Sequence, residues 1–341
     1  MRSVITVARH LRGPNNEGIL ALILLVIVAG MSLANSTFFS LGTLYQVIFN
    51  SMVPLVFALA VLLVIISGGI DVSFAAIAIF AAYTGVKIFT AKGWSGGWLG
   101  LGALAVMLLI GAVLGLINGG VIARFRIPTL IATLGTQSIF KGVLLTWIGS
   151  QYIDHIPAKM DALSGATLLR TSDGYLHVLI IPVIALAVVI SLVLRRTMFG
   201  RSIYAIGGDI EAARRIGFHV VRNQVILYAL VGVIAAFGGW IYCILGRNAN
   251  PQNLVGSELD TIAAVVLGGA AVTGGRGSVV GTVLGVILIQ VIDSSLLLIG
   301  VPSAWQRGAV GVLLLFGAGV QALAALRARG RAKLVHEEVA Q

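Results

Sequence analysis

The chain has 341 residues, of which 58% are hydrophobic and only 10% charged, and its mean hydropathy is +1.04. A soluble domain carries about 25% charged residues, so this composition excludes an ordinary pair of soluble domains and favours membrane spans. The net charge of +11 would suggest a nucleic-acid partner in a soluble protein, but here the basic residues lie between apolar runs, where they set membrane orientation, so no nucleic-acid partner is expected.

Ten apolar segments predict an all-α polytopic membrane protein with about ten transmembrane helices. They cover residues 17–34, 46–66, 72–90, 99–122, 127–148, 176–194, 224–245, 258–273, 277–299 and 305–325. The alternative for the first segment is a signal peptide, because "SLA" at 32–34 resembles a cleavage site, but its apolar core is longer than usual. With the polar tail at 326–341, the whole chain, 1–341, is expected to form one transmembrane domain.

The basic residues predict the orientation of these helices. With the N-terminus inside, most of the 23 Lys and Arg fall in cytoplasmic loops, and the outer loops hold only Lys92, Lys159, Arg170 and Arg247. Basic residues concentrate in cytoplasmic loops of membrane proteins. Both termini and the loop 195–223 are therefore expected in the cytoplasm, and the loop 149–175 outside.

Three pairs of similar segments indicate an internal repeat. "QVIF" at 46–49 matches "QVIL" at 224–227, "GAVLGLINGGVI" at 111–122 matches "GTVLGVILIQVI" at 281–292, and "IPT" at 127–129 matches "VPS" at 301–303. Chance similarity among apolar residues is the alternative. Because the three matches keep one order, we expect two repeats of five helices, about 17–194 and 195–325, with the second inverted.

Glycine spacing favours close helix packing. GxxxG spacings within the apolar segments include those at 111–115, 115–119 and 281–285. In lipid, small residues allow two helix backbones to approach closely. These glycines are expected to join helices rather than to form a site.

The sequence lacks the motifs of zinc proteases and of ATP-binding phosphate loops. It contains no HExxH and no GxxxxGK[ST], and "GAAVTGGRGS" at 269–278 has Arg276 where a phosphate loop needs lysine. The five histidines show no metal-ligand spacing, and the single cysteine, Cys243, excludes an internal disulfide. We expect no catalytic activity, no metal and no cofactor bound by this chain itself.

Polar residues within the apolar segments are candidates for a translocation path, because polar groups at membrane depth are costly and often functional. The candidates are Asn118, Thr133, Gln137, Lys141 and Gln290. Thr133, Gln137 and Lys141 are four residues apart and share one helix face. Hydroxyls and amides would suit a neutral, hydroxyl-rich solute; the alternative is hydrogen bonding between helices.

Two segments predict breaks at the start of helices. "SGGID" at 67–71 precedes the third apolar segment, and "SELD" at 257–260 opens the eighth. Asp71 and Asp260 are the predicted N-caps. Breaks in equivalent positions of two halves can point to a binding site in transporters, but ordinary capping at the membrane edge is the favoured explanation here.

The segment "GGDIEAARRIG" at 207–217 predicts a short helix in the cytoplasmic loop. Gly207 and Gly208 are expected to form a turn, Asp209 to cap the helix and Gly217 to end it. Glu211 would lie in the first turn, and Arg214 and Arg215 in the last, where the helix dipole favours their charges. About two turns are too short to be stable alone, so the helix needs a partner protein or the membrane surface.

Three segments in order resemble the ribose-type permeases of bacterial ABC importers, which handle monosaccharides and the sugar-like autoinducer-2. They are "VIISGGIDVS" at 64–73, "YAIGGDIEAARRIGF" at 204–218 and "ELDTIAAVVLGGAAVTGGRGSVVGTVLG" at 258–285, and the resemblance runs from about 17 to 325. It implies a permease of the bacterial inner membrane that pairs with a second copy or a paralogue. It further implies cytoplasmic ATPase subunits, which bind ATP and Mg²⁺, and a periplasmic solute-binding protein.

The resemblance also implies which residues couple the permease to the ATPase. The family's GGN-x-x-A-A segment matches Gly207, Gly208, Asp209, Ala212 and Ala213, and it docks in the ATPase cleft. Asp209 departs from the family, where asparagine is usual.

An ion-coupled secondary transporter is the alternative function, because it also fits ten helices in five-plus-five repeats. The helix at 207–217 discriminates between the two, since a secondary transporter has no ATPase for that helix to contact.

Overall fold

The computed structural model describes residues 17–35, 38–95 and 100–298, and seven further positions between 300 and 319. Most of the tenth predicted span, 305–325, and the tail at 326–341 therefore lie outside the described residues.

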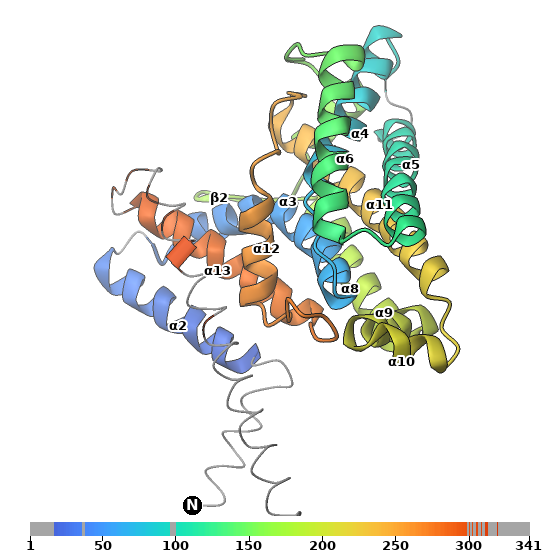
Figure 1. Ribbon diagram of the computed structural model, residues 1–341. Coiled ribbons are helices and arrows are strands. Elements are labelled where there is room, and N and C mark those ends of the chain that lie inside the picture. The colour runs from blue at the N-terminus through green and yellow to red at the C-terminus, as the bar shows by residue number, and fades with distance from the viewer. Residues whose placement is uncertain are drawn as a thin grey trace, which may run out of the picture.

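The described chain is almost entirely helical, with one small β-hairpin. In chain order its elements are α2 (Glu17–Ala34), α3 (Leu41–Ile66), α4 (Phe74–Ala91), α5 (Leu101–Phe125), α6 (Thr129–Val143) with the π-helical turn η2 (Leu144–Ile148), α7 (Ala158–Ser164), β1 (Thr167–Thr171), β2 (Gly174–His177), α8 (Ile180–Arg196), α9 (Met198–Gly208), α10 (Ile210–Arg215), α11 (Val220–Gly246), α12 (Glu258–Leu267) and α13 (Val279–Leu298). Figure 1 shows how these elements are arranged.

Six of these helices are long and apolar enough to cross a membrane, and up to seven spans result if the bent pair α8 and α9 counts as one. The polytopic all-α prediction is thereby confirmed. The pair bends by 73° between Arg196 and Met198, where Thr197 caps α9 by accepting from the Gly200 N–H at 3.0 Å. The predicted span 258–273 differs, because α12 has only ten residues and is too short to cross a bilayer alone.

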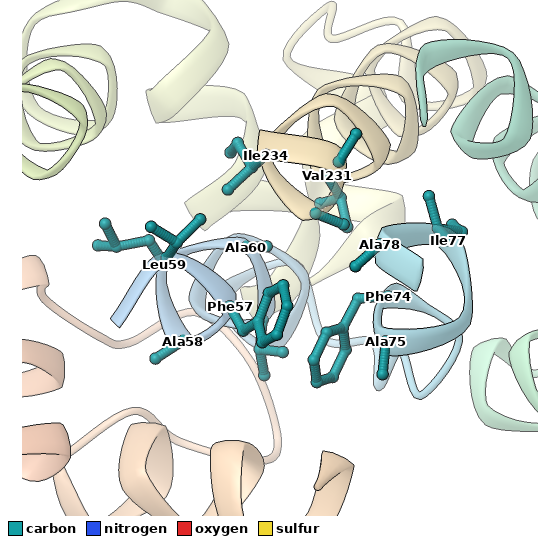
Figure 2. Packing of buried hydrophobic residues seen from close by; sticks show 14 of the residues in the cluster. Phe57, Ala58, Leu59, Ala60, Phe74, Ala75, Ile77, Ala78, Val231 and Ile234 are labelled. Carbon is teal, nitrogen blue, oxygen red and sulfur yellow. The ribbon is translucent and has the colours of Figure 1, made fainter. Parts of the chain in front are cut away.

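Helix α3 forms the centre of the molecule. Its second half, "LVFALAVLLVII" at 55–66, is apolar on every side and entirely buried. Figure 2 shows Phe57 of this helix beside Phe74 of α4, with Val231 and Ile234 of α11 above them. A helix that is hydrophobic all round belongs in a core, which explains why α3 rather than a peripheral helix takes this place.

The GxxxG glycines join α5 to α11, as expected. A Cβ added to Gly111 would overlap the Gly232 carbonyl oxygen, and one added to Gly115 would overlap the Tyr228 carbonyl oxygen. The spacing at 281–285 works in the same way between α13 and α12, because a Cβ on Gly285 would overlap the Ala264 carbonyl oxygen. Close backbone approach at small residues therefore holds both helix pairs together.

The loops gather at two opposite ends of the helix bundle. At one end the predicted outer loops meet: Arg247 pairs with Asp161 through two contacts of 2.8 and 3.0 Å, and Ile153 pairs with Ala249. At the other end Ile66 of α3 accepts from the Gly275 N–H at 2.8 Å, beside α9. This grouping agrees with the two sides predicted from the basic residues.

The hairpin β1–β2 was not predicted. It lies in the loop 149–175 and at the start of the sixth apolar segment, and its strands pair antiparallel with Thr171 opposite Gly174. A Cβ on Gly42 would lie 2.9 Å from the Asp173 carbonyl oxygen, so the hairpin tip packs on the first turn of α3.

Candidate coupling surface and polar crevice

The predicted cytoplasmic helix exists as α10, and Asp209 caps it. The Asp209 carboxylate accepts from the backbone N–H of Ala212 at 3.0 Å and of Glu211 at 2.8 Å. The hydrogen bond from Ala212, helped by that from Glu211, holds the pKa of this carboxyl below its usual value. Arg214 pairs with Glu211 at 2.8 Å, and Gly217, with φ of +95°, follows where the helix ends.

The preceding glycines differ from the prediction. Gly207 and Gly208 are the last two residues of α9 rather than a free turn, and the chain turns at Asp209. The predicted turn was wrong because glycine tolerates a helix wherever tertiary packing supports it.

A small hydrophobic cluster anchors α10 to the rest of the chain. Ala213 is buried together with Ile206 of α9 and Val220 of α11, and Phe218 packs against them. These contacts stabilise a helix that is too short to form alone. Of the two matched alanines, Ala213 therefore serves the fold of the permease itself.

Apart from Ala213, all residues from Gly208 to Gly217 are exposed. Gly208 and Ala212 are exposed, Ile210 is 42% exposed and Ile216 is 71% exposed. We call these four residues the docking face. These small and apolar residues are accessible to a partner protein.

Gly207 connects α9 to the break after α3 and to the loop between α12 and α13. A Cβ on Gly207 would overlap the Ile66 carbonyl oxygen and lie 2.7 Å from the Gly275 nitrogen. A Cβ added to Gly68, in the break after α3, would lie 3.5 Å from the Gly207 Cα. Gly274 packs against both Gly68 and Gly207. We call Gly68, Gly207, Gly274 and Gly275 the glycine junction. Nearby, the Tyr204 hydroxyl of α9 donates to the Gly277 carbonyl at 2.8 Å.

The break between α3 and α4 is stabilised by buried polar side chains. Asp71 does not occupy the N-cap position of α4 as predicted, since Ser73 does. The Asp71 carboxylate instead accepts from the Ser73 backbone N–H at 2.7 Å and from its hydroxyl at 2.6 Å. Asn118 of α5 donates to the same hydroxyl at 2.6 Å.

Helix α6 supplies the remaining partners of this break. The Thr129 hydroxyl accepts from the Ile70 N–H at 2.9 Å, and the Thr133 hydroxyl accepts from the Val72 N–H at 3.4 Å. Backbone groups freed by a broken helix need such partners at membrane depth. Asn118 and Thr133, which were predicted as path residues, thus stabilise the break between α3 and α4.

The second break is capped differently from the prediction. Ser257 holds the N-cap position of α12, and Asp260 is the third residue of the helix. Glu258 is buried, and its carboxylate accepts from the Gly256 N–H at 2.7 Å and from the Gln137 amide of α6 at 2.8 Å. Sequence reasoning missed Glu258, although an acidic residue in a first turn is a signal for such an N-terminal contact.

The five predicted path residues do not line one surface. Asn118 and Thr133 lie at the first break, and Gln137 lies against α12. Lys141 is half-buried on α6 and, within the described chain, forms no ion pair. Gln290 lines a separate crevice between α3, α12 and α13.

The crevice consists of two cavities that share Gln290 and Asp293 of α13. The larger, of about 740 Å³, reaches Asp173 at the tip of the β-hairpin. The smaller, of about 320 Å³, lies against Pro54 and Phe57 in the middle of α3. Volumes of this size are typical of sites for small molecules.

Comparison with known proteins gives the family. The sequence matches the family described as "Branched-chain amino acid transport system / permease component" over residues 43–318. The chain belongs to this family of permeases. It is a multi-pass membrane permease of an ABC import system, as the resemblance in the sequence predicted, and the family is one of transport components rather than enzymes.

Relatives from three bacteria share the name "Autoinducer 2 import system permease protein LsrC". The protein of Yersinia pestis (strain Pestoides F) is 32% identical over 303 residues, which cover 88% of this chain and 83% of the relative. That of Shigella flexneri is 33% identical over 299 residues, covering 87% and 83%. That of Escherichia coli (strain K12 / DH10B) is 32% identical over 298 residues, with the same coverage. No solved structure matches the chain.

Proposed function

We propose that this permease imports a sugar-like solute across the inner membrane of a bacterium, driven by ATP that separate cytoplasmic subunits hydrolyse. Those subunits bind ATP and Mg²⁺, and a periplasmic protein delivers the solute from the side of the loop 149–175. A second permease, either another copy or a paralogue, completes the pair. The relatives named for autoinducer 2 support a sugar-like solute.

The observation that carries the proposal is the docking face on α10 together with the glycine junction. An ATPase that moves α10 would move α9, because Ala213 and Ile206 pack in one cluster. Gly207 of α9 in turn lies against Ile66 at the end of α3 and against Gly275 in the loop between α12 and α13. A movement on the cytoplasmic side thereby reaches both halves of the chain through directly packed backbone.

The alternative, an ion-coupled transporter, offers no reason for an exposed and capped helix at this place. The experiment that separates the two is uptake by proteoliposomes that contain the tagged permease with its co-purified subunits and autoinducer-2 as the first solute. We expect uptake to require ATP and to persist when sodium and proton gradients are dissipated. Uptake that follows an ion gradient without ATP would overturn the proposal.

A further inference from the structure

The crevice between α3, α12 and α13 is lined by polar side chains from facing helices. Thr43, Gln46 and Asn50 follow one face of α3, since they are three and four residues apart. Across the cavity, Gln290 of α13 shares one helix face with Asp293 and Ser294, which follow it by three and four residues. The two polar rows face each other across one continuous space.

The amides of this crevice are not occupied in joining helices. Within the described chain, Gln46, Asn50 and Gln290 have no hydrogen-bond partner, in contrast to Gln137 and Asn118. Polar groups on membrane helices without a protein partner are costly unless water or a solute satisfies them. These side chains are therefore available to a molecule in the cavity.

The charge of the crevice is negative. Asp260 of α12 and Asp293 of α13 both line the smaller cavity, and none of the described residues that line either cavity is Lys or Arg. Two carboxylates accept hydrogen bonds from hydroxyl groups, but they repel a phosphate or a carboxylate.

The inner end of the smaller cavity is apolar and packed. Phe57 forms part of its wall and is fixed by Phe74, whose ring centroid lies 5.4 Å away. Beyond it, a Cβ on Gly277 would lie 2.9 Å from the Ile66 side chain and 3.0 Å from Leu62. The crevice thus opens toward the hairpin and is closed toward the glycine junction.

We propose that this crevice receives the solute, and that it selects uncharged, hydroxyl-bearing molecules over anionic ones. Gln46, Asn50 and Gln290 supply amide hydrogen bonds, and Asp260 and Asp293 accept from hydroxyls and exclude anions. The inference rests on the proposed function for the sugar-like nature of the solute. It assigns the path to α3, α12 and α13 rather than to α6.

The first test needs no solute. The only native cysteine, Cys243, is buried, so single cysteines can be introduced by Asn50→Cys and Gln290→Cys in the assembled complex in membranes. The probes are a cationic and an anionic methanethiosulfonate reagent, and Val113→Cys on α5, an exposed apolar position, is the control. We expect both new thiols to react while the control does not.

The charge selectivity follows from the same variants. Clefts of one sign raise the local concentration of counter-ions by about ten-fold or more, so neutralising both acids with Asp260→Asn and Asp293→Asn should lower the cation-to-anion rate ratio by about ten-fold. If the thiols of Asn50→Cys and Gln290→Cys react no faster than that of Val113→Cys, the crevice is not accessible to solutes and the proposal fails. If neutralising both acids leaves the cation-to-anion rate ratio unchanged, the proposed charge selectivity fails.

The second test uses uptake of autoinducer-2. We expect Gln290→Leu to lower uptake about ten-fold, which corresponds to 1.4 kcal/mol, with the yield of the assembled complex close to that of the wild type. Full uptake would remove the crevice from the path. If the wild-type complex imports nothing, the proposed function fails, while the thiol reactivities still decide whether the crevice is open and negative.

Discussion

Gly207 and Gly208 are neighbours in α9, yet Gly207 is closely packed and Gly208 has open space around it. A Cβ on Gly207 would overlap the Ile66 carbonyl oxygen, whereas a Cβ on Gly208 meets nothing within 4 Å. Gly207→Ala should therefore destabilise the complex by about 1–3 kcal/mol, since added bulk must displace backbone, and should impair stimulated ATP hydrolysis.

Gly208→Ala is the matched control, and it should leave thermal unfolding of the detergent-extracted complex close to that of the wild type. Equal melting temperatures for the two variants would show that the glycine junction is not closely packed.

Gln137 joins α6 to α12 by donating to the buried Glu258 carboxylate. Gln137→Leu removes this donor, and a buried acceptor without its partner costs about 1–3 kcal/mol. We expect lower complex yield and a lower melting temperature, with uptake reduced in parallel. The measurement is uptake of radiolabelled solute beside the yield of extracted complex.

A double-mutant cycle with Glu258→Ala isolates the pair, because the second substitution should add little once the first is present. Reduced uptake at normal yield would instead place Gln137 in the solute path, as the sequence alone suggested.

At the scale of helices, α5 and α11 depend on glycines that sequence spacing identified correctly. Gly115 approaches the Tyr228 carbonyl too closely for a Cβ, while Gly120 on the same helix has open space. Gly115→Ala should lower the melting temperature of the complex, at a cost of about 1–3 kcal/mol. Gly120→Ala should be neutral or slightly stabilising, because alanine favours a helix over glycine. Similar losses for both would mean that α5 and α11 do not pack through this face.

Helix α10 shows what sequence could and could not predict. The N-cap depends only on residues next to it in the sequence, so Asp209 was identified correctly as a polar residue that precedes a helical segment. Ala212 and Ala213 are both alanines in the same segment, yet Ala212 is exposed and Ala213 is buried against Ile206. Only tertiary packing separates them, and for the same reason the glycines before the cap were misread as a turn.

The candidate path shows the same limit. The 3.6-residue period correctly places Thr133 and Gln137 on one face of α6, but it cannot tell which neighbour that face meets. Thr133 meets the break at Val72, and Gln137 meets Glu258. The polar row on α3, at Gln46 and Asn50, was missed because it lies where an apolar segment begins and its partner row comes from a helix more than 200 residues later.

Across the whole molecule, the basic residues in the two groups of loops predict the orientation in the membrane. Asp154 lies in the loop 149–175, and Arg215 lies at the end of α10. In a Cys243→Ala background, Asp154→Cys should react with an impermeant thiol reagent from outside, and Arg215→Cys only from the cytoplasmic side. Labelling of Asp154→Cys exclusively from the cytoplasm would show that the orientation is the reverse of the predicted one.

The central claim is that the docking face of α10 binds the ATPase, and Ala212→Glu tests it most directly. Ala212 is exposed, so glutamate should leave the permease folded while placing bulk and charge in a protein interface. Ala158→Glu, the same substitution at an exposed alanine in α7 at the opposite end of the molecule, is the control. The measurement is the amount of ATPase subunit that co-purifies with the tagged permease, together with solute-stimulated ATP hydrolysis. We predict that Ala212→Glu loses both and that Ala158→Glu retains the ATPase subunit. Normal recovery of the ATPase and normal stimulation with Ala212→Glu would contradict the account.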